Sequence, residues 1–371
     1  MAEGYALTIS AMLGAALLAT AAVAAPITVT PVAAVAGKPL PLHIGGRVDR
    51  VVDGFRRQWP GTYFEAAFHG RGILFTVGPG DVVLTVSVDG VTVTRLVKPR
   101  PGSYRIDGLT SSRHSIRVAV SSESQAAPTV FGGFRTLPGT RALPAPARAR
   151  QIEFIGDSHT VGYGNLATKR DCSEEEVWAT TDTARGIAAL TARRYGADYQ
   201  VNAISGRGIV RNYDGGAGAT LPTAYPFTLF DRATRYADSG WHPRLIAIAL
   251  GTNDFTTALH AGEPWADRAA LHADYEASYV AFVRRLRARD PDAHVLLWAT
   301  DMANGEIAAE VAKVVARLKA AGERNVGFVV VTDLAFSGCH AHPSTADDDR
   351  IATTLANYID GHPEIWAARR R

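Results

Sequence analysis

Hydrophobic and polar positions change their spacing about a third of the way along the chain. Between residues 28 and 136, short apolar runs such as 63–68 and 83–88 are separated by glycine-containing turns, and no helical period of useful length occurs. Asp89-Gly90 stands between the second run and 91–94, which is a typical hairpin sequence. This pattern predicts an all-β, jelly-roll-like sandwich of about a hundred residues.

From residue 151 onward, apolar runs alternate with helical patterns. The expected strands are 152–155, 199–203, 245–250, 295–299 and 326–331, and the expected helices are 183–195, 271–289, 307–321 and 347–358. Such alternation predicts a parallel sheet with helices on both faces. We therefore expect an α/β chain in which a β-sandwich (26–136) and a short proline-rich linker (137–150) precede a three-layer αβα domain (151–371).

The N-terminal residues carry a secretory pattern. An apolar stretch at 11–20 precedes an Ala-x-Ala sequence within residues 21–25, although the only charge ahead of it is Glu3, where Lys or Arg is expected. The stretch is too short for a typical membrane span. We expect residues 1–25 to be a signal peptide, and the mature protein to be secreted or periplasmic without stable membrane association. The alternative is a helix of the mature protein.

Charge composition argues against a nucleic-acid partner. The 371 residues carry a formal net charge of +3, spread over many mixed charges without a basic stripe.

Four polar motifs follow predicted strands of the second domain. They are Gly156-Asp157-Ser158, 205–208 with Gly206, 251–254 with Asn253, and 339–343 with His342. The carboxyl ends of parallel strands share one edge of the sheet, where ligands bind. We therefore expect these motifs to converge on one site.

These residue types match the requirements of acyl transfer. A serine hydroxyl needs a base within hydrogen-bond reach, and His342 can activate Ser158 in this way. The backbone N–H groups of Ser158 and Gly206 and the side-chain amide of Asn253 can form an oxyanion hole. No cofactor or metal is expected. A metal site of Cys339, His340 and His342 would need further ligands, and no second cluster is evident.

The four blocks resemble those of the SGNH (GDSL-like) hydrolases. Ile-Glu-Phe-Ile-Gly-Asp-Ser at 152–158, Gly-Tyr-Gly-Asn at 162–165, Ser-Gly-Arg-Gly at 205–208 and Gly-Cys-x-x-His-Pro-Ser at 338–344 resemble carbohydrate esterase family 2, as do 59–65 and 88–90 in the front half. The resemblance implies a sandwich followed by a hydrolase domain that removes acetyl groups from xylan or related glycans. It places the nucleophile on Ser158, oxyanion donors on Gly206 and Asn253, and the base on His342.

The sequence departs from many SGNH enzymes next to the base. They carry aspartate three residues before the histidine, where this chain has Cys339. A backbone carbonyl could orient His342, as the resemblance allows, or Asp333 or Asp347 could reach it. Because their loops should leave the same edge of the sheet, Cys339 and Cys172 could form a disulfide that holds the base loop, and export would favour it. Two buried free thiols are the alternative.

The expected function is deacetylation of an acetylated polysaccharide or oligosaccharide by an exported serine esterase. Another SGNH activity, on acetylated bacterial polysaccharide or on a lipid ester, is the main alternative. A glycan-binding protein without catalysis is a third possibility.

Overall fold

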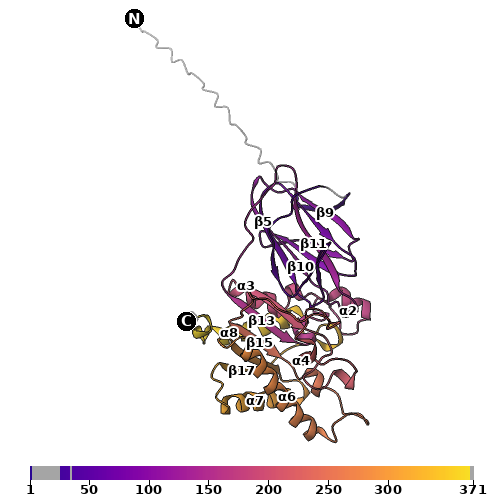
Figure 1. Cartoon of the computed structure of the whole chain (residues 1–371), viewed down its shortest axis with the longest axis vertical. Helices are drawn as coiled ribbons and strands as arrows, with labels where there is room; N and C mark the ends of the chain where they lie inside the picture. The colour runs from indigo at the N-terminus through magenta and orange to yellow at the C-terminus, as the bar shows by residue number, and fades with distance from the viewer. Residues whose placement is uncertain (2–25, 34–35, 368–371) are drawn as a thin grey trace.

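The computed structural model describes Met1, residues 26–33 and residues 36–367. Apart from Met1, the predicted signal peptide lies outside the described residues. An all-β part and an α/β part are stacked along the long axis of the molecule (Figure 1). The predicted fold class is confirmed, whereas the exact domain limits stay a prediction.

The all-β part is a sandwich of two antiparallel sheets. One sheet has the order β1-β9-β6-β11-β4-β3, and the other has the order β12-β5-β10-β7-β8, with β2 also paired to β5. The strands are β1 Thr28–Val32, β2 His43–Gly45, β3 Asp49–Val51, β4 Gly54–Arg57, β5 Tyr63–Gly70, β6 Ile73–Val77, β7 Val83–Val88, β8 Val91–Val97, β9 Gly102–Asp107, β10 Ser112–Val120, β11 Thr129–Thr136 and β12 Arg141–Ala142. Alternate residues of both sheets, including Phe64, Val86 and Phe131, form the core between them.

The α/β part contains a five-stranded parallel sheet of order β14-β13-β15-β16-β17. Its strands are β13 Gln151–Gly156, β14 Asp198–Ala203, β15 Leu245–Ala249, β16 His294–Thr300 and β17 Val326–Val331. The main helices are α3 Ile187–Arg194, α6 Arg268–Arg289, α7 Glu306–Ala320 and α8 Thr345–Asp360, and the short helices are α1 Ser158–Val161, α2 Glu174–Thr180, α4 Leu221–Ala224 and α5 Thr252–Phe255.

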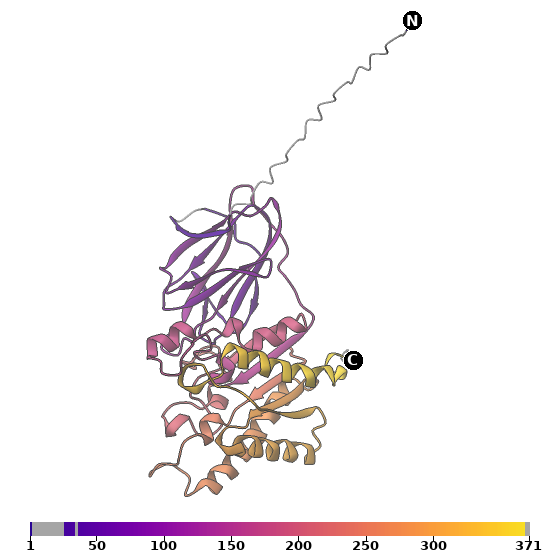
Figure 2. The ribbon, with the colours of Figure 1, turned by 180° about the vertical axis from the view of Figure 1, so that it is seen from behind.

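Strand periodicity divides this part into three layers. Ile155 and Ile248 face a core that α6 and α7 close, while Phe154 and Ala247 face a second core closed by α3 and α8. Consecutive strand residues point to opposite faces, so near-continuous apolar runs are buried on both sides. Helices α6 and α7 lie at the end of the molecule away from the sandwich, and the view from behind shows α8 crossing near the sandwich side (Figures 1 and 2).

Charged and aromatic groups join the sandwich to the α/β part. Arg47, 1% exposed, donates to the carbonyls of Tyr225 and Phe227 and pairs with Glu153 of β13 at 3.4 Å. Trp59 donates to the Phe227 carbonyl at 3.1 Å. The predicted linker also adds the short strand β12 to the sandwich sheet. Buried pairs of this kind are costly to break singly, so they fix how the two parts are packed.

Within the described residues, the four short helices α1, α2, α4 and α5 were missing from the sequence prediction, and α2 is the longest of them. Helix α2 begins after Ser173, whose side chain accepts from the N–H of Glu176 while the Glu176 carboxylate accepts from the N–H of Ser173. This capping box is visible in the sequence as Ser-x-x-Glu and could have revealed the helix.

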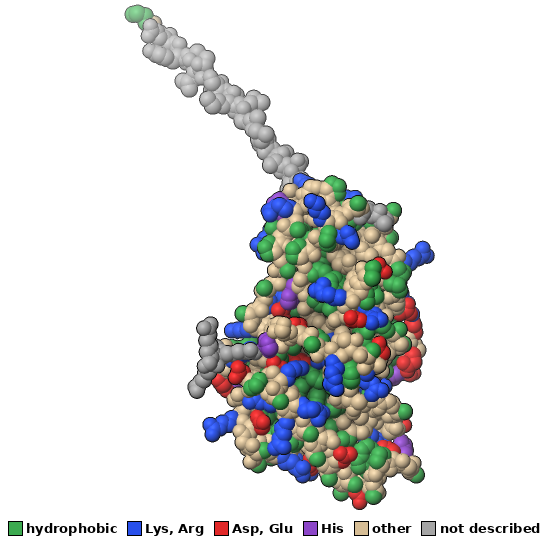
Figure 3. All heavy atoms as spheres, in the orientation of Figure 1, with side chains coloured by type: hydrophobic (Ala, Val, Ile, Leu, Met, Phe, Trp, Pro, Cys, Tyr) green, Lys and Arg blue, Asp and Glu red, His purple; other side chains and the backbone are tan. Residues whose placement is uncertain are grey.

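Polar and charged side chains of both signs are interspersed over the face shown in Figure 3. None of the helices that the structure describes combines the length and the apolar composition needed to cross a bilayer.

Candidate active site

The register of the parallel sheet brings three of the predicted motifs to one level. Gly156, the last residue of β13, pairs with Ala203 of β14 on one side and with Ala249 of β15 on the other. Ser158, Gly206 and Asn253 follow these three residues by two, three and four positions. The motifs therefore leave the same edge of the sheet, and the loop after β17 brings His342 to Ser158.

Ser158 begins the short helix α1. The Asp157 side chain caps this helix by accepting from the His159 N–H at 3.1 Å. Burial raises the pKa of Asp157 to about 7. The Ser158 side chain is thus held in a fixed direction at the strand-to-helix turn.

Ser158 and His342 form a hydrogen-bonded pair. The distance from Ser158 Oγ to His342 Nε2 is 2.8 Å. His342 Nδ1 lies 3.0 Å from the Cys339 carbonyl and 3.2 Å from the His340 carbonyl. Carbonyl oxygens only accept, so Nδ1 carries the ring proton and Nε2 is left as the acceptor for the serine hydroxyl.

The carboxylates that could have oriented His342 are engaged elsewhere. Asp347 caps α8 and accepts from the backbone N–H groups of Ala335 and Phe336. The Asp333 carboxylate accepts from the Thr332 hydroxyl at 3.0 Å. Within the described residues, His342 is therefore oriented by backbone carbonyls. His340 and Ala341 have φ values of 51° and 56°, a conformation that non-glycine residues rarely adopt and that occurs where structure is functionally constrained.

Aromatic rings enclose His342. Tyr163 lies against the His342 ring with centroids 4.3 Å apart, and the ring of His159 meets it edge-on at 5.6 Å. Burial, with a smaller contribution from His159, lowers the pKa of His342 to about 3. A neutral imidazole is the form that can accept a proton, so His342 keeps this ability well below neutral pH.

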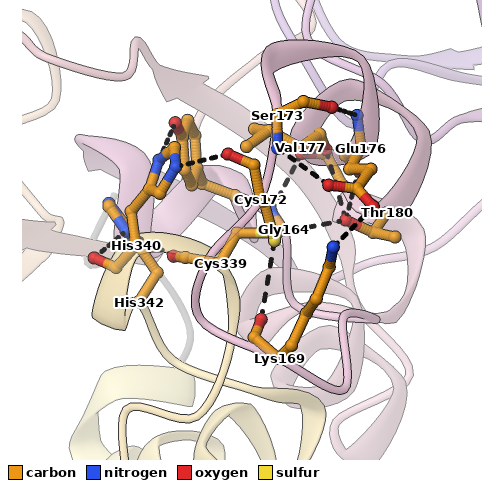
Figure 4. Close-up of a disulfide and its surroundings, with 12 residues drawn as sticks. Gly164, Lys169, Cys172, Ser173, Glu176, Val177, Thr180, Cys339, His340 and His342 are labelled. Carbon is orange, nitrogen blue, oxygen red and sulfur yellow. Dashed lines mark hydrogen bonds and ion pairs between the residues drawn. A yellow bond between two sulfur atoms is a disulfide. The ribbon is translucent and has the colours of Figure 1, made fainter.

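A disulfide joins Cys172 to Cys339, with Cα atoms 5.5 Å apart (Figure 4). It links the loop that precedes α2 to the loop that carries the base. Gly164 makes this approach possible, because a Cβ on Gly164 would lie 2.5 Å from the Cβ of Cys339. The bonded sulfur of Cys339 is not available as a metal ligand.

His340 is held between two partners. Its Nδ1 lies 3.0 Å from the Tyr163 hydroxyl, and its Nε2 lies 2.8 Å from the Cys172 carbonyl (Figure 4). With the disulfide, these contacts fix the turn whose carbonyls orient His342.

The proposed oxyanion donors lie in a connected network. Gly206 has a φ of 79°, and Asn253 Nδ2 lies 3.0 Å from the Arg207 carbonyl and 3.3 Å from Asp157 Oδ2. Asn253 therefore touches both the loop after β14 and the residue before the nucleophile.

Asp254 holds the rest of this loop. Its carboxylate accepts from the N–H groups of Ile209, Val210 and Arg211 at 2.9–3.0 Å. Burial raises the pKa of Asp254 to about 6. Gly208 is needed there, because a Cβ would lie 2.4 Å from Asp254 Oδ2.

Sequence reasoning missed two groups of residues beside the site. The sequence analysis included Tyr163 only within the Gly-Tyr-Gly-Asn motif. That motif does not indicate that the Tyr163 ring packs on the His342 ring. Glu123 and Gln125 come from the sandwich and bond to Ser205. No local pattern could have connected residues that lie about 80 positions apart in the sequence.

Family models match both parts of the chain. Residues 44–146 match the model for the carbohydrate esterase 2 N-terminal region, and residues 154–364 match the GDSL-like lipase/acylhydrolase family. The chain is 43% identical over 337 residues to an acetylxylan esterase / glucomannan deacetylase of Cellvibrio japonicus (strain Ueda107), covering 89% of this chain and 93% of that protein. It is 29% identical over 314 residues to the cellulase/esterase CelE of Acetivibrio thermocellus, covering 81% of this chain but 37% of that protein.

Solved structures show the same arrangement. One is a carbohydrate esterase whose active site is described as displaying divergent catalytic and non-catalytic binding functions (TM-score 0.83, 41% identity, 89% of this chain and 100% of that chain). Another is a family two carbohydrate esterase from Clostridium thermocellum in complex with cellohexaose (TM-score 0.77, 26% identity, 87% and 99% coverage). The two-part fold therefore has solved counterparts.

Proposed function

The chain belongs to carbohydrate esterase family 2, and we propose that it removes O-acetyl groups from xylan or related plant glycans with a Ser158–His342 dyad. It is a carboxylic ester hydrolase of the GDSL-like class. The observation that carries the mechanism is the 2.8 Å contact between Ser158 Oγ and His342 Nε2, together with the two carbonyls that fix the ring proton on Nδ1.

Acylation begins when Ser158 Oγ attacks the acetyl carbonyl carbon while its proton passes to His342 Nε2. The resulting oxyanion is stabilised by the N–H groups of Ser158 and Gly206 and by the Asn253 amide, which turns from its present acceptors toward the substrate. Collapse of the intermediate expels the sugar oxygen, which takes the proton from His342, and leaves acetyl-Ser158.

Deacylation reverses these roles. A water molecule gives a proton to His342 Nε2 and attacks the acetyl carbon, and acetate leaves as Ser158 recovers its proton. The imidazolium formed in each half-reaction is stabilised through Nδ1–H by the Cys339 and His340 carbonyls. Carbonyl dipoles replace the carboxylate that completes a triad.

The substrate class is supported by the relatives. The 43% identical protein is named an acetylxylan esterase / glucomannan deacetylase, and a related esterase binds cellohexaose. We therefore propose an acetylated β-linked plant polysaccharide or oligosaccharide as substrate, without a role for nucleic acid or a membrane.

We also propose that the protein is exported and works outside the cytoplasm. The signal pattern of residues 1–25 and the Cys172–Cys339 disulfide support this location, since disulfides persist in oxidising compartments.

Acetate release from a panel of acetylated xylan, acetylated glucomannan and an acetylated bacterial polysaccharide tests the substrate class, with 4-nitrophenyl acetate as control. Ser158→Ala and His342→Ala should each abolish release without lowering the melting temperature much, and the double variant should be scarcely worse than either single one. Ser103→Ala in β9, far from the site, is the matched control. Substantial activity in Ser158→Ala would refute the dyad.

Asn253→Ala tests the oxyanion hole. Loss of one donor lowers kcat roughly a hundred- to a thousandfold, with a smaller change in KM. A variant that changes only KM would place Asn253 in ground-state binding instead.

A further inference from the structure

A loop of the sandwich reaches the catalytic edge of the hydrolase sheet. The loop connects β10 to β11, and the Ser121 carbonyl anchors its start by accepting from the Thr183 N–H at 3.0 Å. Further along, Glu123 Oε1 accepts from the Ser205 N–H at 2.8 Å, and Gln125 Nε2 donates to the Ser205 carbonyl at 3.2 Å. Both backbone polar groups of Ser205 are thus bound by side chains of the sandwich.

The Ser205 carbonyl has a direct relation to the proposed oxyanion hole. It belongs to the same peptide unit as the Gly206 N–H, and the two groups point in opposite directions across a trans peptide plane. A hydrogen bond that fixes the direction of the Ser205 oxygen therefore also fixes the direction of the Gly206 N–H. In the part of the chain that the structure describes, Gln125 is the one donor to this oxygen.

Side-chain packing does little to hold this peptide. A Cβ placed on Gly206 would meet no atom within 4 Å. On the hydrolase side, the Ile204 carbonyl accepts from the Arg207 N–H at 3.3 Å and the Gly206 carbonyl accepts from the Tyr213 N–H at 2.9 Å. These two bonds close the turn but involve neither the Ser205 carbonyl nor the Gly206 N–H, and the bond to the Ser205 carbonyl comes from the sandwich.

These side chains are themselves braced. Gln125 Nε2 also lies 3.1 Å from Glu123 Oε1, and the Gln125 carbonyl accepts from Gln58 Nε2 at 3.1 Å. Gln58 Oε1 in turn accepts from the Phe230 N–H of the hydrolase part at 2.8 Å. The hydrogen bonds connect Phe230 of the hydrolase part through Gln58 and Gln125 of the sandwich to Ser205 of the hydrolase part. The orientation of the Ser205 peptide therefore depends on how the two parts are packed.

We propose that the sandwich completes the active site, with Gln125 and Glu123 acting as positioning residues that aim the Gly206 N–H at the oxyanion. This inference rests on the proposed function, because it takes Gly206 as an oxyanion donor. Both residues also line a cleft of about 700 Å³ together with Tyr163, whose ring packs on His342. The sandwich is then a part of the catalytic apparatus and not only a neighbouring module.

The test compares two substitutions of Gln125 in the full-length enzyme. Gln125→Ala removes the donor, and Gln125→Glu keeps the shape but places a carboxylate against the Ser205 carbonyl. Gln125 is exposed, so both variants should fold and melt close to the parent. We expect kcat for 4-nitrophenyl acetate to fall about tenfold or more, below the roughly hundred- to thousandfold loss of a whole donor, with KM within about twofold.

Two further comparisons distinguish a positioning role of Glu123 from a general effect of the substitution on the structure. Glu123→Gln keeps an oxygen that can accept from the Ser205 N–H and should retain most of kcat, whereas Glu123→Ala should not. Asp107→Asn changes a sandwich carboxylate in β9 that pairs with Arg105 and lies outside this cleft, so it should leave kcat unchanged.

A boronic acid that adds to Ser158 supplies a second readout, since its tetrahedral adduct occupies the oxyanion hole. Its inhibition constant should rise in the Gln125 variants in proportion to the loss of kcat. An unchanged kcat and unchanged boronate affinity in Gln125→Glu, or a change confined to KM, would overturn the proposal. Loss of activity in Ser158→Ala would still support the Ser158–His342 dyad if the Gln125 variants behave like the parent. The proposed dyad and the proposed positioning role of Gln125 and Glu123 can therefore fail independently.

Discussion

Opening the Cys172–Cys339 disulfide should lower both the stability and the turnover of the enzyme. Cys339 has two roles in the structure: its sulfur is bonded to the loop before α2, and its carbonyl accepts from Nδ1 of His342. Reduction, or the double substitution Cys172→Ala/Cys339→Ala, removes the covalent tie but leaves the backbone carbonyl in place. The expected defect is therefore looser placement of the base and not its loss.

The stability change follows from the length of chain that the bridge closes. The two cysteines are 167 residues apart, and the chain-entropy model gives about 5 kcal/mol for a loop of this size. Measured losses for native disulfides are typically about 2–5 kcal/mol. At roughly 2–4 °C per kcal/mol for a domain of this size, the melting temperature should fall by roughly 4–20 °C.

The effect on turnover has an upper bound. A misplacement of about 1 Å in a catalytic group can cost about a hundredfold in rate. Other contacts still hold the base loop, including the bonds of His340 to Tyr163 and to the Cys172 carbonyl. We therefore expect kcat to fall by less than about a hundredfold.

The assay follows hydrolysis of 4-nitrophenyl acetate and thermal unfolding with and without reductant, and thiol titration of the denatured protein establishes the redox state. Reductant should impair the parent and have no effect on the double-alanine variant, which is the matched control. Two reactive thiols in unreduced protein would refute the bridge. A fully reduced enzyme with the parent's kcat would refute its role in holding His342.

Three further predictions concern protonation, buried carboxyls and substrate size. Because burial lowers the pKa of His342 to about 3, the neutral base persists in acid, and kcat/KM should show no acid limb at the ordinary histidine value of about 6.5; a limb there would contradict the assigned environment of the base. Asp254→Asn places an amide NH2 against backbone N–H groups and should cost about 1–3 kcal/mol in denaturant unfolding, with a fall in kcat. Asp348→Asn should be nearly neutral at pH 7, because burial raises the pKa of Asp348 to about 8 and the carboxyl is already protonated; equal losses in the two variants would refute this distinction. Activity on aryl esters should fall steeply from acetyl to butyryl and longer chains, and a preference for octanoyl esters would favour the lipid alternative.

The sequence determined the architecture because strand and turn signals are local. The apolar runs predicted as strands 152–155 and 199–203 are observed as β13 and β14, extended by one or two residues at their ends. Asp89-Gly90 forms the expected hairpin between β7 and β8. The period-two pattern of strands and the period-3.6 pattern of helices extend over only a few residues. They can therefore be recognised without knowledge of the tertiary contacts.

The sequence also indicated which motifs meet, through one topological rule. Strands that alternate with helices form a parallel sheet, and their carboxyl ends then share an edge. This was sufficient to nominate Ser158, Gly206, Asn253 and His342 before any distance was known, and the structure places Ser158 and His342 in contact.

Tertiary structure alone decided how those residues are supported. The sequence left Asp333, Asp347 and a backbone carbonyl as alternatives for orienting His342, and the conformation of the 339–341 turn favours the carbonyls of Cys339 and His340. The link from Gln125 to Ser205 depends on how the sandwich packs on the hydrolase part. The lowered pKa of His342 depends first on the burial of its ring and then on the neighbouring His159. Burial and contacts between distant segments arise only when the chain is folded, so no local pattern contains them.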